Sequence, residues 1–141
     1  VEHLDVRSFT TRAAMGSAAA LDIAAAMRER VARSGAVRMV FAAAPSQAEM
    51  LVALVAMPDV PWDRVTAFHM DEYVGLAPAA PQRFAAWLGT HLFDRVSLGA
   101  VHRIEPDPDP ASEARRYAAL LAAAPIDIVC LGIGVNGHIA F

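Results

Sequence analysis

Apolar and polar positions along this chain alternate between two spacings, one typical of short buried strands and the other of amphipathic helices. Short apolar runs bounded by glycine, proline or polar residues predict strands at 1–6, 37–42, 64–70, 101–104 and 126–134. Longer stretches rich in Ala, Leu, Met, Arg and Glu predict helices at 11–33, 49–57, 82–96 and 112–123. Gly35 is the predicted stop of the first helix, and Ser46 and Ser112 are candidate caps of later ones.

Strands and helices follow one another in turn, which predicts an α/β fold with a doubly wound, mostly parallel sheet and helices on both faces. Residues 1–141 fit one domain. The last predicted strand and its loop come just before Phe141. Because a four-stranded open sheet leaves a bare edge, we expect the C-terminal part of the domain to be missing from this sequence.

Composition narrows the class of protein. Hydrophobic residues make up 56% of the chain, but no apolar run approaches the about 20 residues of a membrane span, so no membrane partner is expected. The net charge of −3 and the absence of a basic stripe argue against nucleic acid. The single cysteine, Cys130, allows no internal disulfide and favours the cytoplasm. The chain contains no lysine, so these residues cannot form a Schiff base.

Two clusters could carry chemistry, and both lie at the carboxyl end of a predicted strand, where ligands of such sheets bind. The first is Asp71 and Glu72, which leave the strand 64–70 side by side. Adjacent carboxylates in a partly dry cleft repel each other, so one can have a pKa high enough for a general base. Alternatively, one of the two carboxylates caps a turn.

The second cluster is the glycine-rich loop GIGVNGH, which follows the strand 126–134. Gly132, Gly134 and Gly137 let the backbone approach a ligand closely. His138 can exchange protons near neutral pH, and Asn136 could orient His138 or bind a sugar hydroxyl. The spacing does not fit a dinucleotide fingerprint, and a tight turn with an incidental histidine is the alternative.

The loop AAAPSQ at 42–47 follows the second predicted strand, where phosphate could meet helix N-terminal amides. Ala44, Ser46 and Gln47 are its possible contacts, although Ser46 could equally be a plain helix cap. No pair of His or Cys residues has the spacing of metal ligands, so no metal is expected.

These clusters resemble the glucosamine-6-phosphate deaminase/isomerase family. The matching stretches are VTAFHMDEYVGL (65–76), LFDRV (92–96), ARRYAALL (114–121) and LGIGVNGHIAF (131–141). The resemblance implies a Rossmann-like α/β fold, often assembled as a homo-oligomer. It also implies conversion of glucosamine 6-phosphate to fructose 6-phosphate and ammonia without an organic cofactor.

The resemblance also implies a role for each matching residue. Asp71 matches the base that moves a proton between C2 and C1 of the sugar, and Glu72 is the carboxylate beside it. His138 matches the residue that opens the sugar ring. Asn136 matches a position, Asp or Asn, that assists this histidine, and Gly137 is an expected substrate contact next to it.

The sequence departs from the family pattern in three places. The family loop that reads TGGTP or TGSTP is AAAPSQ here, which alters the phosphate cradle. Arg83 stands where the family often has Ser, and it could bind an anion or face solvent. The family segment Asn-Glu-Pro would begin at position 142, so the sequence 1–141 alone should be inactive.

Two other functions fit the pattern less well. A 6-phosphogluconolactonase usually has DER and GHTASLFP-like segments, where this chain has DEY and GHIAF. A sugar-phosphate-binding regulatory module would keep the fold without turnover, and the altered AAAPSQ loop is the reason to consider it.

Overall fold

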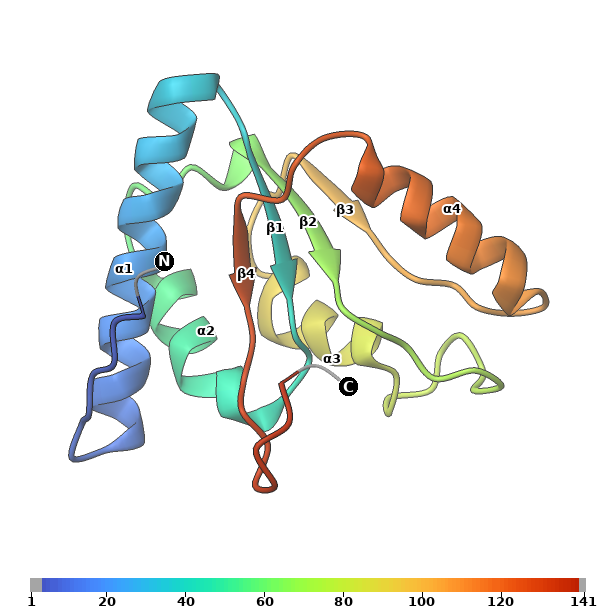
Figure 1. The fold of residues 1–141 in the computed structure, drawn as a ribbon, viewed down its shortest axis with the longest axis horizontal. Coiled ribbons are helices and arrows are strands. Elements are labelled where there is room, and N and C mark those ends of the chain that lie inside the picture. Colours follow the sequence, from blue (N-terminus) through green and yellow to red (C-terminus); the bar gives the residue numbers. More distant parts are fainter. Residues whose placement is uncertain (1–3, 140–141) are drawn as a thin grey trace.

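Four parallel strands form one sheet in the computed structural model, which describes residues 4–139 (Figure 1). In chain order they are β1 (Val37–Phe41), β2 (Val65–His69), β3 (Ala100–His102) and β4 (Ile128–Cys130). Their order across the sheet is β3-β2-β1-β4, so the chain builds outward from β1 on one side and then returns to its other side. This reversal creates a crevice at the carboxyl ends of β1 and β4.

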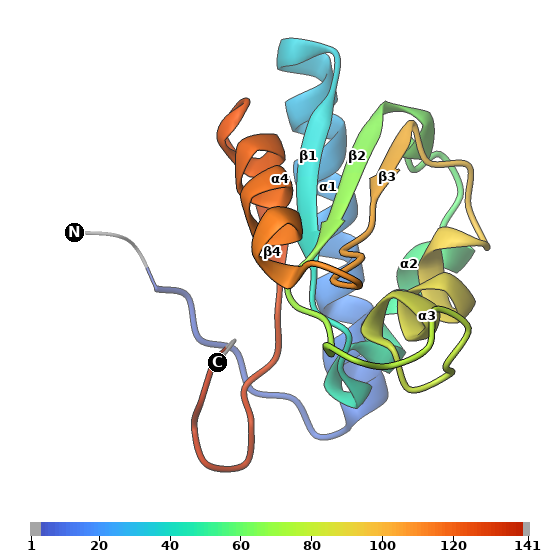
Figure 2. The same cartoon turned by 90° about the vertical axis from the view of Figure 1, so that its right-hand side faces the viewer.

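Helices cover both faces of the sheet, as the alternating pattern predicts (Figure 2). One face carries α1 (Arg12–Ser34), α2 (Ala48–Ala56) and α3 (Phe84–Leu88), which continues as the π-helical segment Gly89–Phe93. The other face carries α4 (Pro110–Ala122). Short 3₁₀ turns, Pro45–Gln47 and Trp62–Arg64, precede α2 and β2. The predicted doubly wound α/β fold is therefore confirmed.

The longest helix, α1, begins and ends at residues whose local chemistry favours a helix boundary. The Thr11 hydroxyl accepts a hydrogen bond from the Ala14 N–H at 3.1 Å, which satisfies one of the free amides of the first turn. Gly35 ends the helix at φ 79°, a left-handed conformation that favours glycine, and its N–H bonds the Val31 carbonyl.

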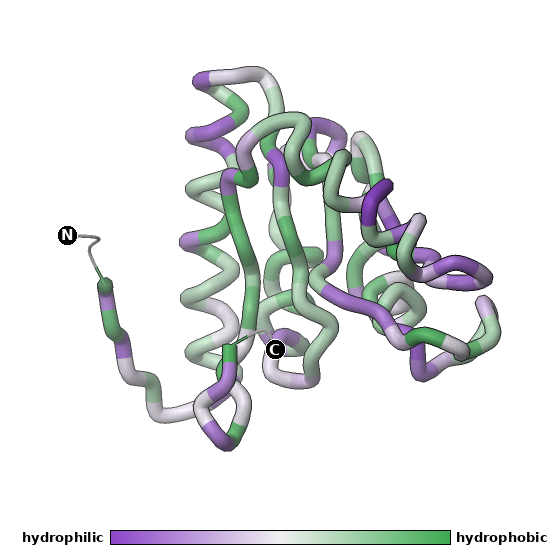
Figure 3. Tube along the Cα trace, turned by 45° about the vertical axis from the view of Figure 1, so that its right-hand side comes forward, coloured by the Kyte–Doolittle hydropathy of each residue, from purple (hydrophilic) through white to green (hydrophobic). Residues whose placement is uncertain are grey.

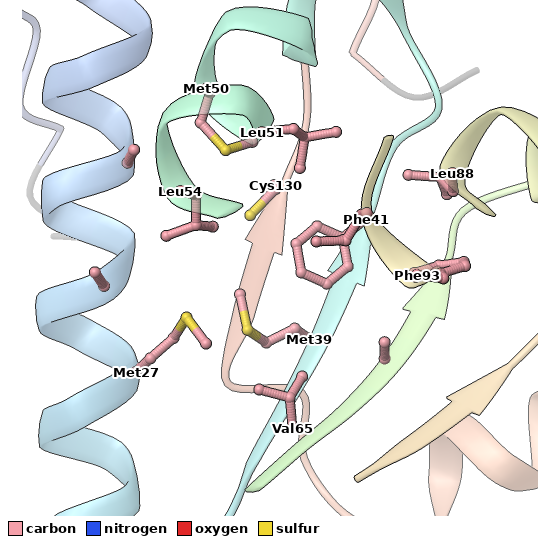
Figure 4. Close-up of a cluster of buried hydrophobic side chains, with 14 of the residues drawn as sticks. Met27, Met39, Phe41, Met50, Leu51, Leu54, Val65, Leu88, Phe93 and Cys130 are labelled. Atoms are coloured by element: carbon pink, nitrogen blue, oxygen red, sulfur yellow. The ribbon is translucent and has the colours of Figure 1, made fainter. Parts of the chain in front are cut away.

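Alternation along β1 separates a dry face from a wetter one. Met39 and Phe41 point toward α1 and α2 and are buried in the core with Val65 and Met27 (Figure 4). Figure 3 shows that the strands are mostly hydrophobic, whereas hydrophilic and hydrophobic positions alternate along α1. Burying such side chains contributes about 1.5–3 kcal/mol each.

The opposite face is held by Arg38, which joins β1 to the end of α4. Its guanidinium donates to the carbonyls of Leu120 and Leu121, two of the last carbonyls of α4. The same guanidinium stacks 4.9 Å from the centroid of the Phe68 ring. The Leu120 carbonyl also accepts from the Ala123 amide, and the added bonds from Arg38 fix the end of α4 against the sheet.

Several sequence-based expectations about elements are wrong. Residues 4–6 form no strand, and residues 1–3 lie outside the described part of the chain. The strand predicted at 126–134 is limited to β4, which lies at an edge of the described sheet with Val129 49% exposed. Asp109, and not Ser112, caps α4, because its carboxylate accepts from the Ala111 and Ser112 amides.

Gly16 allows α1 and α2 to pack closely. A Cβ at this position would lie 2.7 Å from the Glu49 Cβ and 2.8 Å from the Met50 nitrogen. We expect Gly16→Ala to lower the free energy of unfolding of the full-length protein by about 1–3 kcal/mol in urea denaturation, because the backbone of α2 cannot yield easily. Ser17→Ala, at the neighbouring exposed position, should change it by less than about 0.5 kcal/mol. Equal effects of the two substitutions would contradict this packing argument.

Candidate active site

Loops that follow β1, β2 and β4 line one cavity of about 420 Å³ at the carboxyl ends of the strands. The loop after β1 contributes Ala44 and Ser46, and the loop after β2 contributes Asp71. The loop after β4 contributes Gly134 and His138. The cavity therefore lies where the strand order reverses, and a carboxylate and an imidazole from distant parts of the sequence share it.

Asp71 lies two residues beyond β2 and is half-buried. Burial raises the pKa of its carboxyl group, and the negative charge of Glu72 raises it further. Both effects disfavour the ionised form, so the carboxylate becomes a stronger base than an exposed aspartate. This is the electrostatic environment that a general base requires.

Glu72 has a different environment, with its side chain 0% exposed. One carboxylate oxygen accepts from the Tyr73 and Phe84 amides at 2.9 and 3.0 Å. The other accepts from the Ala85 amide at 3.0 Å. Glu72 therefore caps the first turn of α3, as the turn-capping alternative proposed, and it does not line the cavity.

Arg83 is the charge partner of Glu72. Its side chain is 8% exposed, its Nε lies 3.4 Å from the Glu72 carboxylate, and its Nη2 donates to the Ile104 carbonyl. The expectation that Arg83 could face solvent is therefore wrong. Together the pair fixes the loop between β2 and α3.

Replacing Glu72 with Gln removes the negative charge that acts on Asp71 and that pairs with Arg83. We expect the pKa of Asp71 to fall toward its ordinary value, so that the acidic limb of the activity profile of the full-length enzyme moves to lower pH. We also expect the free energy of unfolding to fall by about 1–3 kcal/mol, since an amide cannot accept all three backbone bonds. Measured pH profiles and urea denaturation test both effects, and an acidic limb that stays in place would contradict the electrostatic link.

The loop after β4 turns back on itself through its glycines. The Gly134 amide donates to the His138 carbonyl at 2.9 Å, and Gly137 adopts φ 85°. A Cβ at Gly134 would lie 2.3 Å from the imidazole ring, so glycine is required for this ring position. The turn thus presents His138 to the cavity from an exposed loop.

Asn136 orients His138 within this turn. Its Oδ1 accepts a hydrogen bond from the imidazole Nδ1, so the ring proton lies on Nδ1 and Nε2 is the basic nitrogen. Asn136 and Gly137 are exposed and are not among the residues that line the cavity. Asn136 therefore meets the cavity only through His138.

The loop after β1 forms the 3₁₀ turn Pro45–Gln47. Ser46 does not cap α2, because Gln47 occupies the N-cap position and makes no side-chain capping bond. Gln47 is buried and faces a second cavity, between α1, α2 and β4. A Cβ at Gly132 would lie 2.2 Å from the Ser46 hydroxyl oxygen, so the loops after β1 and β4 are in direct contact.

Arg12 also lines the cavity, and sequence reasoning did not identify it. It extends from the first turn of α1, donates to both Glu49 carboxylate oxygens and to the Pro45 carbonyl, and thereby braces the loop after β1. The Arg12 guanidinium lowers the pKa of Glu49 to about 2. No local motif indicates this role, because the partners are more than thirty residues apart in the chain.

A family model described as "Glucosamine-6-phosphate isomerases/6-phosphogluconolactonase" matches residues 10–140. The chain belongs to this family. The glucosamine-6-phosphate deaminase of Listeria monocytogenes is 36% identical over 127 residues, which cover 89% of this chain and 53% of that protein. The deaminase of Exiguobacterium sp. is 45% identical over a shorter stretch of 78 residues, 55% of this chain and 31% of that protein.

Solved structures of the family share the fold. A protein described as a monomeric glucosamine-6-phosphate deaminase superposes with a TM-score of 0.88 at 23% identity, covering 98% of this chain and 58% of that one. A 6-phosphogluconolactonase from Shewanella baltica gives 0.81 at 24% identity, covering 94% and 58%. The chain spans about half the length of the curated Listeria relative.

Among the described residues, no helix is both long and apolar enough to cross a membrane. Between residues 4 and 139 no cluster of three or more His, Cys, Asp or Glu side chains is arranged to hold a metal ion.

Proposed function

We propose that the full-length protein is a glucosamine-6-phosphate deaminase-like enzyme that isomerises and deaminates an amino-sugar 6-phosphate. The observation that carries the proposal is the shared cavity of Asp71 and His138, one a carboxylate with a raised pKa and the other an imidazole with a basic Nε2. Deaminase relatives at 36% identity over most of this chain support the same reaction.

In the proposed reaction, His138 moves the proton that opens the sugar ring, and Asn136 keeps the imidazole in the required tautomer. Asp71 then removes the proton from C2 of the open-chain aldose and returns a proton to C1. Water hydrolyses the resulting ketimine, so ammonia leaves and fructose 6-phosphate remains. Each acid–base step of this kind is typically worth about 10²–10⁴-fold in rate.

Substrate binding is proposed for the loop after β1 and for the residues around the two catalytic groups. Ser46 and Ala44 line the cavity, and we assign them contacts with the substrate. Gly137 allows the turn that carries His138. Gln47 and Glu72 are buried, so we assign them the support of the neighbouring loops.

Ammonia release by the full-length protein tests the proposal. Incubation with glucosamine 6-phosphate should release ammonia and fructose 6-phosphate in equal amounts, and Asp71→Asn should slow the release of both by about 10²–10⁴-fold. Hydrolysis of 6-phosphogluconolactone without ammonia release would instead support a lactonase, the second activity in the family description. Binding of the sugar phosphate without turnover would identify a regulatory module and overturn the proposal.

We further propose that the enzyme is cytoplasmic, is a hydrolase of a C–N bond and forms a homo-oligomer. The first point is supported by the single buried cysteine. The oligomer rests on the family resemblance alone, and one solved relative is described as monomeric. Light scattering of the full-length protein decides between these states.

A further inference from the structure

His69, the last residue of β2, joins two loops through its ring. The residue is 1% exposed. Its Nε2 accepts a hydrogen bond from the Ile104 amide at 2.8 Å, so the ring proton must lie on Nδ1. Nδ1 lies 2.9 Å from the Asp71 carbonyl oxygen and therefore donates to it. One buried ring thus ties the segment after β3 to the backbone of Asp71.

Tyr117 of α4 holds the same strand end from its other side. Its hydroxyl accepts from the His69 amide at 2.8 Å and can donate to the His69 carbonyl at 2.9 Å or to the His102 carbonyl at 3.3 Å. The Tyr117 ring also packs edge-on against Phe68. Consequently, the backbone is anchored at His69 by Tyr117 and at Asp71 by the imidazole.

The surroundings keep the His69 ring neutral. Burial lowers the pKa of His69, and the positive charges of Arg103 and Arg83 act in the same direction. The negative charge of Glu72 and the hydrogen bond to the Asp71 carbonyl raise the pKa of His69 and so oppose these effects. Glu113 on α4 also interacts electrostatically with His69. A second proton would place an N–H against the Ile104 N–H, so the neutral form with its proton on Nδ1 fits both partners.

We propose that His69 is a positioning residue for Asp71, which fixes the Asp71 carbonyl through Nδ1–H and so sets where the carboxylate projects into the cavity. The next residue in the chain, Glu72, is itself anchored to the start of α3, so the backbone of Asp71 is held on both sides. The inference rests on the proposed function. Misplacing a catalytic group by about 1 Å can cost about 10²-fold in rate.

Three substitutions of His69 in the full-length enzyme separate positioning from packing. His69→Leu removes both ring bonds and should lower kcat by about 10–100-fold with little change in KM. Asn carries its amide where Nδ1 lies, so His69→Asn can still donate to Asp71 and should recover most of kcat. Gln carries its amide oxygen near Nε2, so His69→Gln can keep the Ile104 bond but should not recover kcat.

Thermal unfolding of the same three variants provides the comparison. If His69 had only a structural role, kcat would fall in proportion to Tm, and the Asn and Gln variants would have similar kcat values. That result would overturn the proposal. Full activity of His69→Leu would overturn it as well. The expected result is that the Asn and Gln variants have similar Tm values but differ in kcat.

A measurement without turnover keeps this test separate from the proposed function. If the wild-type protein releases no ammonia, the proposed function fails, and carboxyl ¹³C NMR titration of Asp71 then decides the positioning role. His69→Leu should lower the pKa of Asp71 as the carboxylate relaxes toward solvent, and His69→Asn should keep it raised. An Asp71 titration that is the same in all variants would exclude positioning by His69.

Discussion

Asp71→Asn is expected to reduce ammonia release by the full-length enzyme by about 10²–10⁴-fold. The substitution keeps the shape of the side chain but removes the only oxygen pair that can accept the C2 proton at this position. Because the amide can still hydrogen-bond to a sugar, KM should change much less than kcat. Steady-state kinetics on glucosamine 6-phosphate measure both.

The same variant has a predictable effect on stability, which distinguishes lost chemistry from lost folding. The pKa of Asp71 is higher in the folded protein than its unfolded value of about 3.8. At pH values above about 3.8, ionisation of Asp71 therefore lowers the free energy of unfolding. Asp71→Asn should therefore raise the free energy of unfolding at pH 7, and this gain should vanish below about pH 4. A variant that is inactive and also less stable at pH 7 would contradict the assigned environment.

His138→Gln is expected to have the second-largest effect. Glutamine can donate and accept hydrogen bonds but cannot exchange a proton near neutral pH, so kcat should fall by about 10²-fold or more. The loss should be smaller with an acyclic substrate analogue, since ring opening would no longer be required. Parallel assays of the wild type and the variant with cyclic and acyclic substrates measure the two losses of kcat.

His91→Gln is the matched control, because His91 stacks on Trp87 at 4.0 Å and bonds its carbonyl. It is not among the residues that line the cavity. The control should keep the wild-type kcat. If the two histidine variants lose the same activity, His138 has no special role in ring opening.

The elements that sequence predicts well are those whose boundaries depend on neighbouring residues. Thr11 and Gly35 set the ends of α1 through bonds within one turn, and the predicted helix 11–33 is confirmed within a residue or two. The runs around Met39 and Ala67 are apolar because β1 and β2 are interior strands of the sheet. Their composition alone therefore identifies them as strands, even when the neighbouring strands are not known.

The features that sequence did not predict depend on contacts between distant segments. Arg12 reaches the loop after β1, and Glu72 caps α3 from twelve or thirteen residues away. The helix predicted at 82–96 is a five-residue α-helix followed by a π-helical segment, and apolar spacing does not distinguish the two. The shared cavity of Asp71 and His138 could be predicted, because the carboxyl ends of parallel strands meet at one edge.

Pairing within the sheet gives β1 an influence on catalysis that its own side chains do not suggest. Phe41 lies level with His69 of β2 on one side and with Cys130 of β4 on the other. The strand thus works as a spacer that determines how far the proposed acid and base stand from each other. Inserting or deleting one residue within 37–41 should therefore misalign both groups at once.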